Sequence, residues 1–134
     1  MVRGMLVVML VGTGTDIIEI GRIRETIARH GQRFLGRVFT PGEIAYCERK
    51  KNAAESYAGR FAAKEAAAKA LGTGIARGVS WREIEVSRAP GERPTLSFHG
   101  RAAKRARAMG AGAAALSISH SRELALATVL LESK

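Results

Sequence analysis

The stretch AGRFAAKEAAAKALGTG, residues 58–74, decides the fold of this chain. Alanine has the highest helix propensity, and residues 62–70 are alanine apart from three charged side chains. The stretch therefore predicts a long helix from about Ala54 to Leu71, which Gly72 ends. Because the side chains of this helix are so small, another body can approach its backbone closely.

Before the long helix, the sequence predicts a strand and two further helices. The run Leu6–Val11 (LVVMLV) is apolar, as in a buried strand, and Gly12–Thr15 after it is typical of a tight turn. A helix with three isoleucines on one face then extends to Gly31. Thr40–Glu43 (TPGE) starts the next helix, with threonine as N-cap, proline in the first turn and glutamate completing a capping box. That helix fades near Lys50.

After Gly72 the pattern changes to short strands around one basic helix. The expected elements are a half-buried strand at Trp81–Val86, a turn at Ala89–Pro94, a strand at Thr95–Phe98, a helix at Arg101–Met109, and a hairpin of strands at Ala114–His120 and Leu124–Leu131. The order β-α-α-α-β-β-α-β-β predicts an α+β fold, in which a largely antiparallel sheet is packed with the long helix. Since there is no linker or internal repeat, we expect one domain over residues 1–134.

The composition narrows the class of protein. Lysine and arginine number 22 against 12 acidic residues, and the resulting charge of +10 attracts nucleic acid, phosphorylated cofactors or an acidic protein, although it also serves solubility alone. The single cysteine, Cys47, excludes an internal disulfide and a thiolate zinc cluster. The run Leu6–Val11 is too short to span a bilayer and lacks a signal-cleavage pattern, so we expect a cytoplasmic chain with no membrane partner.

Asp16 is the first candidate for chemistry. It follows the expected buried strand across a Gly-x-Gly turn, where the scaffold fixes a side chain that solvent can still reach. A carboxylate there can hold a hard cation such as Mg²⁺, which binds one or two protein carboxylates together with substrate phosphates. An aspartate just before a helix is also an ordinary N-cap, and position alone favours the cap.

Charged side chains on the long helix form a second candidate group. Arg60 and Lys64 are four residues apart, as are Glu65 and Lys69, so each pair lies along one helix face. Glu65 could supply a second metal carboxylate while the lysines neutralise a phosphate, but spacing alone favours an ordinary surface ion pair. The turn Gly72–Gly74 could offer backbone N–H groups to a phosphate or only end the helix.

His120 lies at the end of a strand within Ser117–Ser121. It could orient a phosphate, relay a proton or only cap a turn. The chain has no Gly-x-Ser-x-Gly elbow and no acid spaced to orient His120, which argues against a serine hydrolase. His30 and His99 have no ligand spacing to His120, which argues against a zinc site.

Taken together, four segments resemble the holo-acyl-carrier-protein synthases, and the similarity runs from about Met5 to Glu132. Each segment alone is modest, but four in the family's order and spacing are specific, and they outweigh the structural alternatives above. Phe39-Thr40-x-x-Glu43 is also similar to the family's loop between the first helices. The four segments are Gly12-x-Gly14-x-Asp16-Ile17-x-Glu19-Ile20-x-Arg22-Ile23, Ala58–Ala66, Lys69–Ile75 and Ser117–Ser121.

The resemblance implies a 4'-phosphopantetheinyl transferase-like fold and a magnesium-dependent enzyme, a homotrimer with active sites between subunits. Such an enzyme transfers the 4'-phosphopantetheine group of coenzyme A to a serine of apo acyl carrier protein and releases adenosine 3',5'-bisphosphate, which supports fatty acid biosynthesis. By residue matching, Asp16 and Glu65 are the metal ligands and, with Lys69, the catalytic residues. The implied coenzyme A site comprises Arg60, Lys64, Lys69, Gly72, Thr73, Gly74, Ser119 and His120, and the implied carrier-protein site comprises Arg22, Arg24, Arg29 and Arg33.

The resemblance leaves three points open. The base that takes the serine proton is either Glu65 or a water on the metal. Ala67 and Ala68 replace bulkier family residues, so one pantetheine contact is expected to be lost. Met5 is an alternative start of the chain, in which case Met1–Gly4 would be disordered.

Two other functions fit parts of the sequence. The charge and the basic segment Arg101–Arg107 suggest a nucleic-acid-binding module, but the chain lacks an aromatic stacking set or a recognisable RNA or DNA motif, so we expect no nucleic-acid partner. A family member that binds coenzyme A without catalysis is disfavoured because both carboxylates and Lys69 are present.

Overall fold

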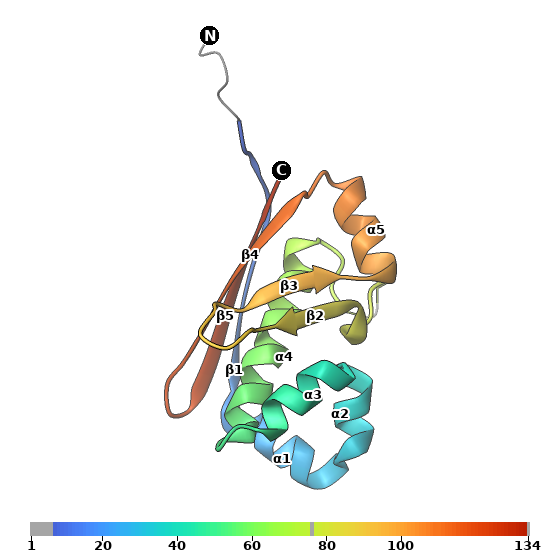
Figure 1. Ribbon diagram of the computed structural model, residues 1–134. Helices are drawn as coiled ribbons and strands as arrows, with labels where there is room; N and C mark the ends of the chain where they lie inside the picture. The colour runs from blue at the N-terminus through green and yellow to red at the C-terminus, as the bar shows by residue number, and fades with distance from the viewer. Residues whose placement is uncertain (1–6, 76, 134) are drawn as a thin grey trace.

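The computed structural model describes residues 7–75 and 77–133. Within them, two antiparallel sheets and four shorter α-helices are arranged around one long helix (Figure 1). In chain order the elements are β1 (Leu10–Glu19), α1 (Ile20–His30), α2 (Gln32–Val38), α3 (Pro41–Glu48), α4 (Ala53–Ala70), the 3-10 turn η1 (Trp81–Glu83), β2 (Ile84–Ser87), β3 (Thr95–Phe98), α5 (Gly100–Ala108), β4 (Ala113–His120) and β5 (Leu124–Glu132). The predicted α+β class is confirmed, and the expected disorder of Met1–Gly4 concerns residues outside the described ones.

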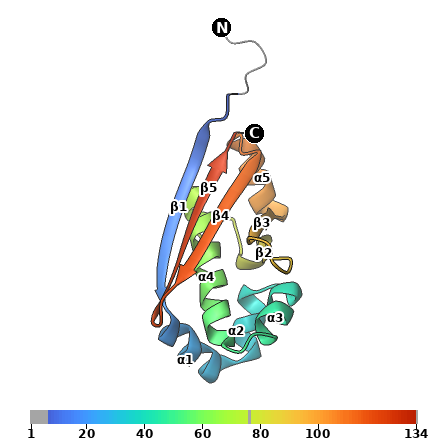
Figure 2. The ribbon, with the colours of Figure 1, turned by 60° about the vertical axis from the view of Figure 1, so that its left-hand side comes forward.

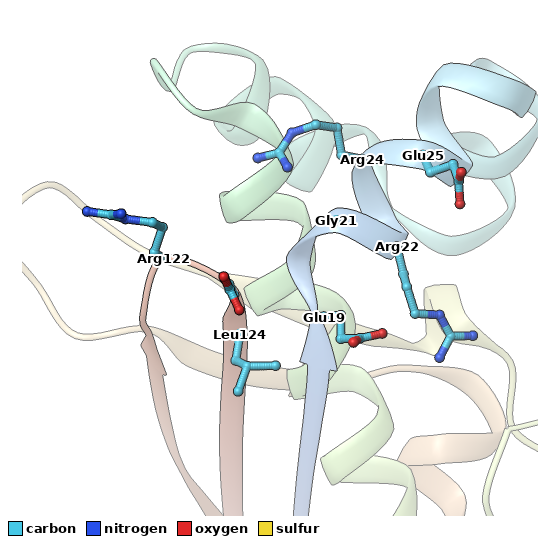
Figure 3. A pocket seen from close by; sticks show the side chains of 8 residues that line it. Glu19, Gly21, Arg22, Arg24, Glu25, Arg122 and Leu124 are labelled. Carbon is cyan, nitrogen blue, oxygen red and sulfur yellow. The ribbon is translucent and has the colours of Figure 1, made fainter.

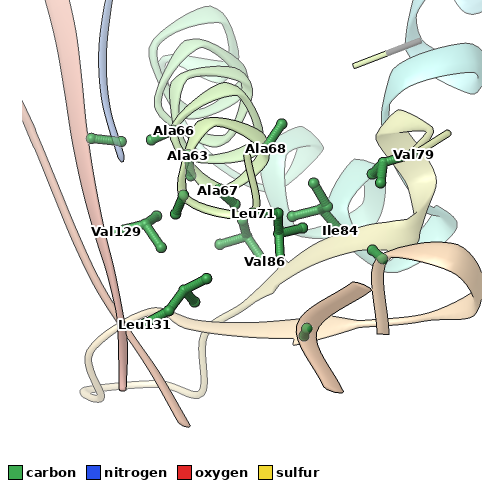
Figure 4. Close-up of a cluster of buried hydrophobic side chains, with 14 of the residues drawn as sticks. Ala63, Ala66, Ala67, Ala68, Leu71, Val79, Ile84, Val86, Val129 and Leu131 are labelled. Atoms are coloured by element: carbon green, nitrogen blue, oxygen red, sulfur yellow. The ribbon is translucent and has the colours of Figure 1, made fainter. Parts of the chain in front are cut away.

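Helix α4 lies between the two sheets. The sheet β1-β5-β4 covers one side of it and the β2–β3 hairpin lies on the other, as Figures 1 and 2 show from two directions. In the close-up of the core, Val129 and Leu131 of β5 and Ile84 and Val86 of β2 point toward α4 from different sides (Figure 4). Alanines on α4 fill the narrow space between them, and burying these apolar surfaces stabilises the fold at about 25 cal/mol per Å².

Strand β1 corrects the predicted turn at Gly12–Thr15. The predicted buried strand at Leu6–Val11 is also wrong, because β1 begins only at Leu10 and Val7, Val8, Met9 and Leu10 are exposed. Residues 12–15 lie inside this strand, which runs on to Glu19, because two glycines let it approach α4 backbone to backbone. A Cβ on Gly14 would collide with the carbonyl oxygen of Ala66 and lie 2.8 Å from the amide nitrogen of Ala70. The glycines thus serve close packing, and Asp16 is a strand residue and not an N-cap.

The segment between β1 and α4 contains one helix more than predicted. Gly31 ends α1 as expected, with a φ of +53°, but α2 follows at once. The short α2 has a glycine in its interior, Gly36, so its sequence has little helical signal, and it carries Arg33. The capping box of α3 is confirmed: the amide of Glu43 donates to Thr40 Oγ1 (3.2 Å), and the amide of Thr40 donates to Glu43 Oε1 (2.8 Å).

The C-terminal half follows the predicted order with one shift. Trp81–Glu83 form a 3-10 turn and not a strand, because Glu83 accepts the amide of Ser80 (2.8 Å) and winds the chain before β2 begins. The hairpin of β4 and β5 is confirmed. In the sheet order β1-β5-β4, β1 and β4 are the two edge strands, so they are about 10 Å apart.

The face of the three-stranded sheet turned away from α4 carries exposed apolar side chains. Ile17 of β1 is 58% exposed and is the register partner of Leu126 of β5, and Leu124 and Leu130 lie on the same face. Alternation along each strand explains this, since the neighbours of these residues point toward α4. Within residues 7–75 and 77–133, no helix is both long enough and apolar enough to cross a membrane.

Candidate active site

Asp16, Glu65 and Lys69 gather where the edge strand β1 meets α4. The ammonium of Lys69 lies 3.0 Å from Asp16 Oδ1 and also donates to the carbonyl oxygen of Thr15 (3.0 Å). Asp16 and Glu65 both line a pocket of about 570 Å³. The structure therefore brings together the three residues expected to be catalytic, although the strand and the helix that carry them are far apart in the sequence.

The two carboxylates suit a hard divalent cation. Burial raises the pKa of Glu65, the negative charge of Asp16 raises it further, and Lys69 only partly offsets both. A cation bound between two neighbouring carboxylates stabilises their ionised forms, and carboxylate oxygens are the ligands that Mg²⁺ prefers. The donor set of this pocket thus fits the predicted metal.

Aromatic side chains that sequence reasoning missed form a wall of this pocket. The rings of Phe61 on α4 and Trp81 on η1 are stacked, with centroids 4.8 Å apart and planes at 29°. Phe34 of α2 and Ile23 of α1 line the pocket from the helical side. The carboxylates therefore lie beside an apolar surface. The only sequence signal for this was the spacing of Phe61 and Glu65, four residues apart on one helix face.

Arg60 and His120 line a different pocket, of about 270 Å³. Arg60 is 6% exposed, its guanidinium carbon lies 3.9 Å from the ring centroid of Tyr46, and its Nε has no hydrogen-bond partner among the described residues. Arg88 and Arg93, from the loop between β2 and β3, line the same pocket. A buried guanidinium with a free N–H and two more arginines make this pocket suitable for phosphate groups.

The surroundings of His120 and Tyr46 reflect the charge of this second pocket. His120 Nδ1 lies 3.3 Å from Glu55 Oε2, so an acid does lie beside this histidine, contrary to the expectation from spacing, because α4 and β4 meet only in the fold. Burial by itself would raise the pKa of Tyr46, but Lys50 and Arg60 outweigh it and lower the pKa. The pocket is thus electropositive around an aromatic ring.

Lys64 lies apart from the other residues expected to bind coenzyme A. Its side chain is 0% exposed and forms an ion pair with Glu43 Oε1 at 2.7 Å. The ammonium also donates to the carbonyl oxygens of Trp81 and Ile84, so its three N–H groups are engaged inside the protein. In the described chain, Lys64 does not face either pocket.

The remaining residues expected to bind coenzyme A lie in the turn after α4 and at the end of β4. The amides of Gly72, Thr73 and Gly74 donate to carbonyl oxygens of the last turn of α4, so they end the helix and are not directed at a ligand. Both glycines have positive φ values, +77° and +68°, as such a helix end requires. Ser119 is exposed on β4, next to His120.

The four predicted carrier-binding arginines are all exposed. Arg22 and Arg24, at the start of α1, line a hollow of about 440 Å³ that extends to the turn between β4 and β5 (Figure 3). Arg122 of that turn and Leu124 at the start of β5 also line it, and sequence reasoning did not single them out. Acidic side chains also line the hollow, so it is mixed in charge with an apolar contribution from Leu124.

The pocket lined by Asp16 and Glu65 and the pocket lined by Arg60 and His120 lie on different sides of the chain. Arg60 and Glu65 are five residues apart on α4, which separates their directions by about 140°. Asp16 belongs to β1 and His120 to β4, the opposite edges of the sheet. One chain therefore divides the predicted site residues between a carboxylate pocket and an arginine pocket.

Comparison with known proteins gives the family. The model of the 4'-phosphopantetheinyl transferase superfamily matches residues 12–129. A holo-[acyl-carrier-protein] synthase of Koribacter versatilis is 56% identical, over 92% of this chain and 99% of that protein. The crystal structure of the synthase from Neisseria meningitidis has a TM-score of 0.84 at 36% identity (92% of this chain, 98% of that one), and that from Helicobacter pylori in complex with coenzyme A has 0.78 at 34% (89% and 98%). The chain belongs to the 4'-phosphopantetheinyl transferase superfamily, and within it to the holo-[acyl-carrier-protein] synthases.

Proposed function

We propose that this protein transfers the 4'-phosphopantetheine group of coenzyme A to a serine of apo acyl carrier protein, with Mg²⁺ held by Asp16 and Glu65. The single observation that carries the proposal is the convergence of these two carboxylates in one pocket, with Lys69 bound to Asp16, in a chain that belongs to this family. A role in fatty acid biosynthesis and a cytoplasmic location, as predicted from the sequence, are part of the proposal.

The residues of the carboxylate pocket suit phosphoryl transfer. The serine hydroxyl gives its proton to Glu65 or to a water molecule, and its oxygen forms a bond to the phosphorus nearest the pantetheine. The bond from that phosphorus to the bridging oxygen breaks, and adenosine 3',5'-bisphosphate leaves. Bound Mg²⁺ would supply positive charge for the diphosphate oxygens as this bond breaks. Lys69, which pairs with Asp16 in the free protein, is positioned to neutralise the leaving phosphate, and the apolar wall of Phe61 and Trp81 strengthens these interactions by excluding water.

We further propose that the active site forms between subunits of a homotrimer. The arginine pocket has the charge to hold the phosphates of the adenosine portion of coenzyme A, but it lies on a different side of the chain from the carboxylates. A neighbouring copy could bring its Arg60 and His120 to the carboxylates of the first. The exposed apolar face of Ile17, Leu124, Leu126 and Leu130 is a surface that such an assembly would bury.

The transferase activity is tested by mass spectrometry of apo carrier protein incubated with this protein, coenzyme A and Mg²⁺. A gain of one phosphopantetheine is the expected result. It should disappear when the carrier serine is replaced by alanine or when the divalent cation is chelated. Binding of RNA without any mass gain would instead support the nucleic-acid-binding alternative.

The carrier-protein surface is tested by reversing charges on α1. Arg22→Glu combined with Arg29→Glu is expected to raise the KM for carrier protein about 10-fold or more, because arginines that attract an acidic partner chiefly speed its encounter, while the KM for coenzyme A stays nearly constant. The matched control, Lys104→Glu with Arg107→Glu on α5, changes the net charge equally and should leave both constants nearly unchanged. An equal effect of the two double variants would mean that net charge alone acts.

The shared site is tested by mixing two inactive variants. Glu65→Gln alone and His120→Ala alone should each lose most activity. Trimers reassembled from equal amounts of both should regain about one quarter of the wild-type activity, since one ordered pair of neighbours in four has both residues intact. If mixing restores nothing while each variant still forms trimers, the site lies within a single chain.

A further inference from the structure

The burial of Lys64 is not explained by a role in binding phosphate. Lysine is almost never fully buried unless it is paired, and here burial lowers the pKa of Lys64 although the charge of Glu43 opposes this. Replacing a buried ion pair by apolar residues of similar size is often neutral or stabilising. The contacts of Lys64 therefore point to something that this pair positions, beyond a contribution to stability.

The Lys64–Glu43 pair joins four elements at one point. Glu43 Oε2 accepts the amide of Val86 in β2 (2.7 Å), and Glu43 Oε1 accepts the amide of Thr40 at the start of α3 (2.8 Å). From α4, Lys64 donates to the carbonyl oxygen of Trp81 in η1 (3.1 Å), which also accepts the amide of Ile84. The pair thus holds the backbone of η1 against α4 from inside the core.

The side chain of Trp81 lies on the other side of this anchor, in the carboxylate pocket. Its indole is stacked on Phe61, which precedes Lys64 by one helical turn and Glu65 by four residues. Trp81, Phe61, Asp16 and Glu65 line the same pocket. If η1 moved away from α4, the stacked pair would separate and water would enter beside the carboxylates.

We propose that Lys64 is a positioning residue that acts through Trp81: its ammonium fixes the backbone of η1 and thereby the Phe61–Trp81 wall of the carboxylate pocket. This inference rests on the proposed function only in one respect: it treats the carboxylate pocket as the active site. It replaces the expectation that Lys64 is part of the coenzyme A site. A ligand that enters the pocket meets the aromatic wall and not the ammonium.

The chain offers a direct probe, because Trp81 is its single tryptophan. In the double variant Lys64→Met/Glu43→Gln, which removes both charges at similar volume, the fluorescence of Trp81 is expected to shift to longer wavelength and its quenching by acrylamide to rise at least about 2-fold. Far-UV circular dichroism should stay unchanged. The control Lys104→Met, on the exposed face of α5, should alter neither signal. If the double variant fails to fold, Lys64→Gln, whose amide still donates, should give a smaller shift in the same direction.

Unchanged emission and quenching in a folded variant would overturn the proposal whether or not the protein is a transferase. Because this readout needs no substrate, failure of the proposed function and failure of this inference are distinguishable.

Kinetics separate positioning from phosphate binding. The double variant should lower kcat/KM by about 10–100-fold, and in a Trp81→Leu background the same change should have little further effect, since the two residues act as a unit. Mg²⁺ affinity should be nearly unaffected. If Lys64 instead contacted a phosphate, its replacement would raise the KM for coenzyme A equally in both backgrounds, and that result would contradict the proposal.

Discussion

Replacing Glu65 with glutamine is expected to lower phosphopantetheine transfer by about 10³-fold or more, because a metal ligand that stabilises transition-state charge contributes several kcal/mol. Glutamine keeps the size and burial of the side chain but not the charge that binds a cation. Isothermal titration with Mg²⁺ should show the same loss without any substrate present. Glu92→Gln, in the exposed loop between β2 and β3, removes an equal charge and should leave turnover and Mg²⁺ binding unchanged. Near-normal turnover by folded Glu65→Gln would contradict the metal assignment.

The raised pKa of Glu65 predicts the direction in which pH and Mg²⁺ change the stability of the fold. The folded chain keeps the Glu65 proton to a higher pH than the unfolded chain, so folding becomes less favourable as the pH rises between the two pKa values. At neutral pH the ionised carboxylate therefore destabilises the metal-free protein. Glu65→Gln is expected to raise the Tm of metal-free protein at neutral pH, whereas Mg²⁺ should raise the Tm of the wild type and not that of the variant.

The substitution Gly14→Ala is expected to destabilise the fold by about 3 kcal/mol or more, a large share of the 5–15 kcal/mol typical of a domain. The added methyl group would meet the carbonyl oxygen of Ala66 and the amide nitrogen of Ala70. Because both are backbone atoms of α4, no side chain can rotate away, and the strand must separate from the helix. Urea unfolding followed by circular dichroism measures the change.

Gly36→Ala is the matched control for this prediction. It adds the same methyl group at an exposed position in α2, where nothing lies within 4 Å of the new atom. An alanine in a helix should stabilise the protein by about 0.4–1 kcal/mol relative to glycine. Opposite signs for the two variants would support the close approach of β1 and α4, and a mild effect at Gly14 would mean that the two elements can separate without loss.

The order of most elements could be predicted from local sequence signals. The alanine run, the capping box at Thr40 and the C-terminal hairpin are local patterns, and each is confirmed. The strand β1 was misjudged because Gly12 and Gly14 have the same local signature in a turn as in a strand packed on a helix. Only the position of α4, set by residues more than fifty positions later, distinguishes the two cases.

The site was predictable only in part. Asp16, Glu65 and Lys69 were identified from the family resemblance, and their convergence required the fold. Glu55 beside His120 and Trp81 beside Phe61 are contacts between elements distant in sequence, which spacing within one element cannot reveal. Lys64 was grouped with the ligand-binding residues from its spacing to Arg60 and from the family resemblance, yet it points about 100° away from its neighbour Glu65 on the helix.

The contact between β1 and α4 also has a consequence for how this protein tolerates change. Where two main chains touch, their separation is fixed by the radii of peptide atoms and not by which side chains happen to fill a gap. The strand bearing Asp16 and the helix bearing Glu65 should therefore keep their spacing while the interior around them drifts in composition. Mutational scanning should find that interior substitutions reduce protein yield without altering which divalent ion the protein prefers.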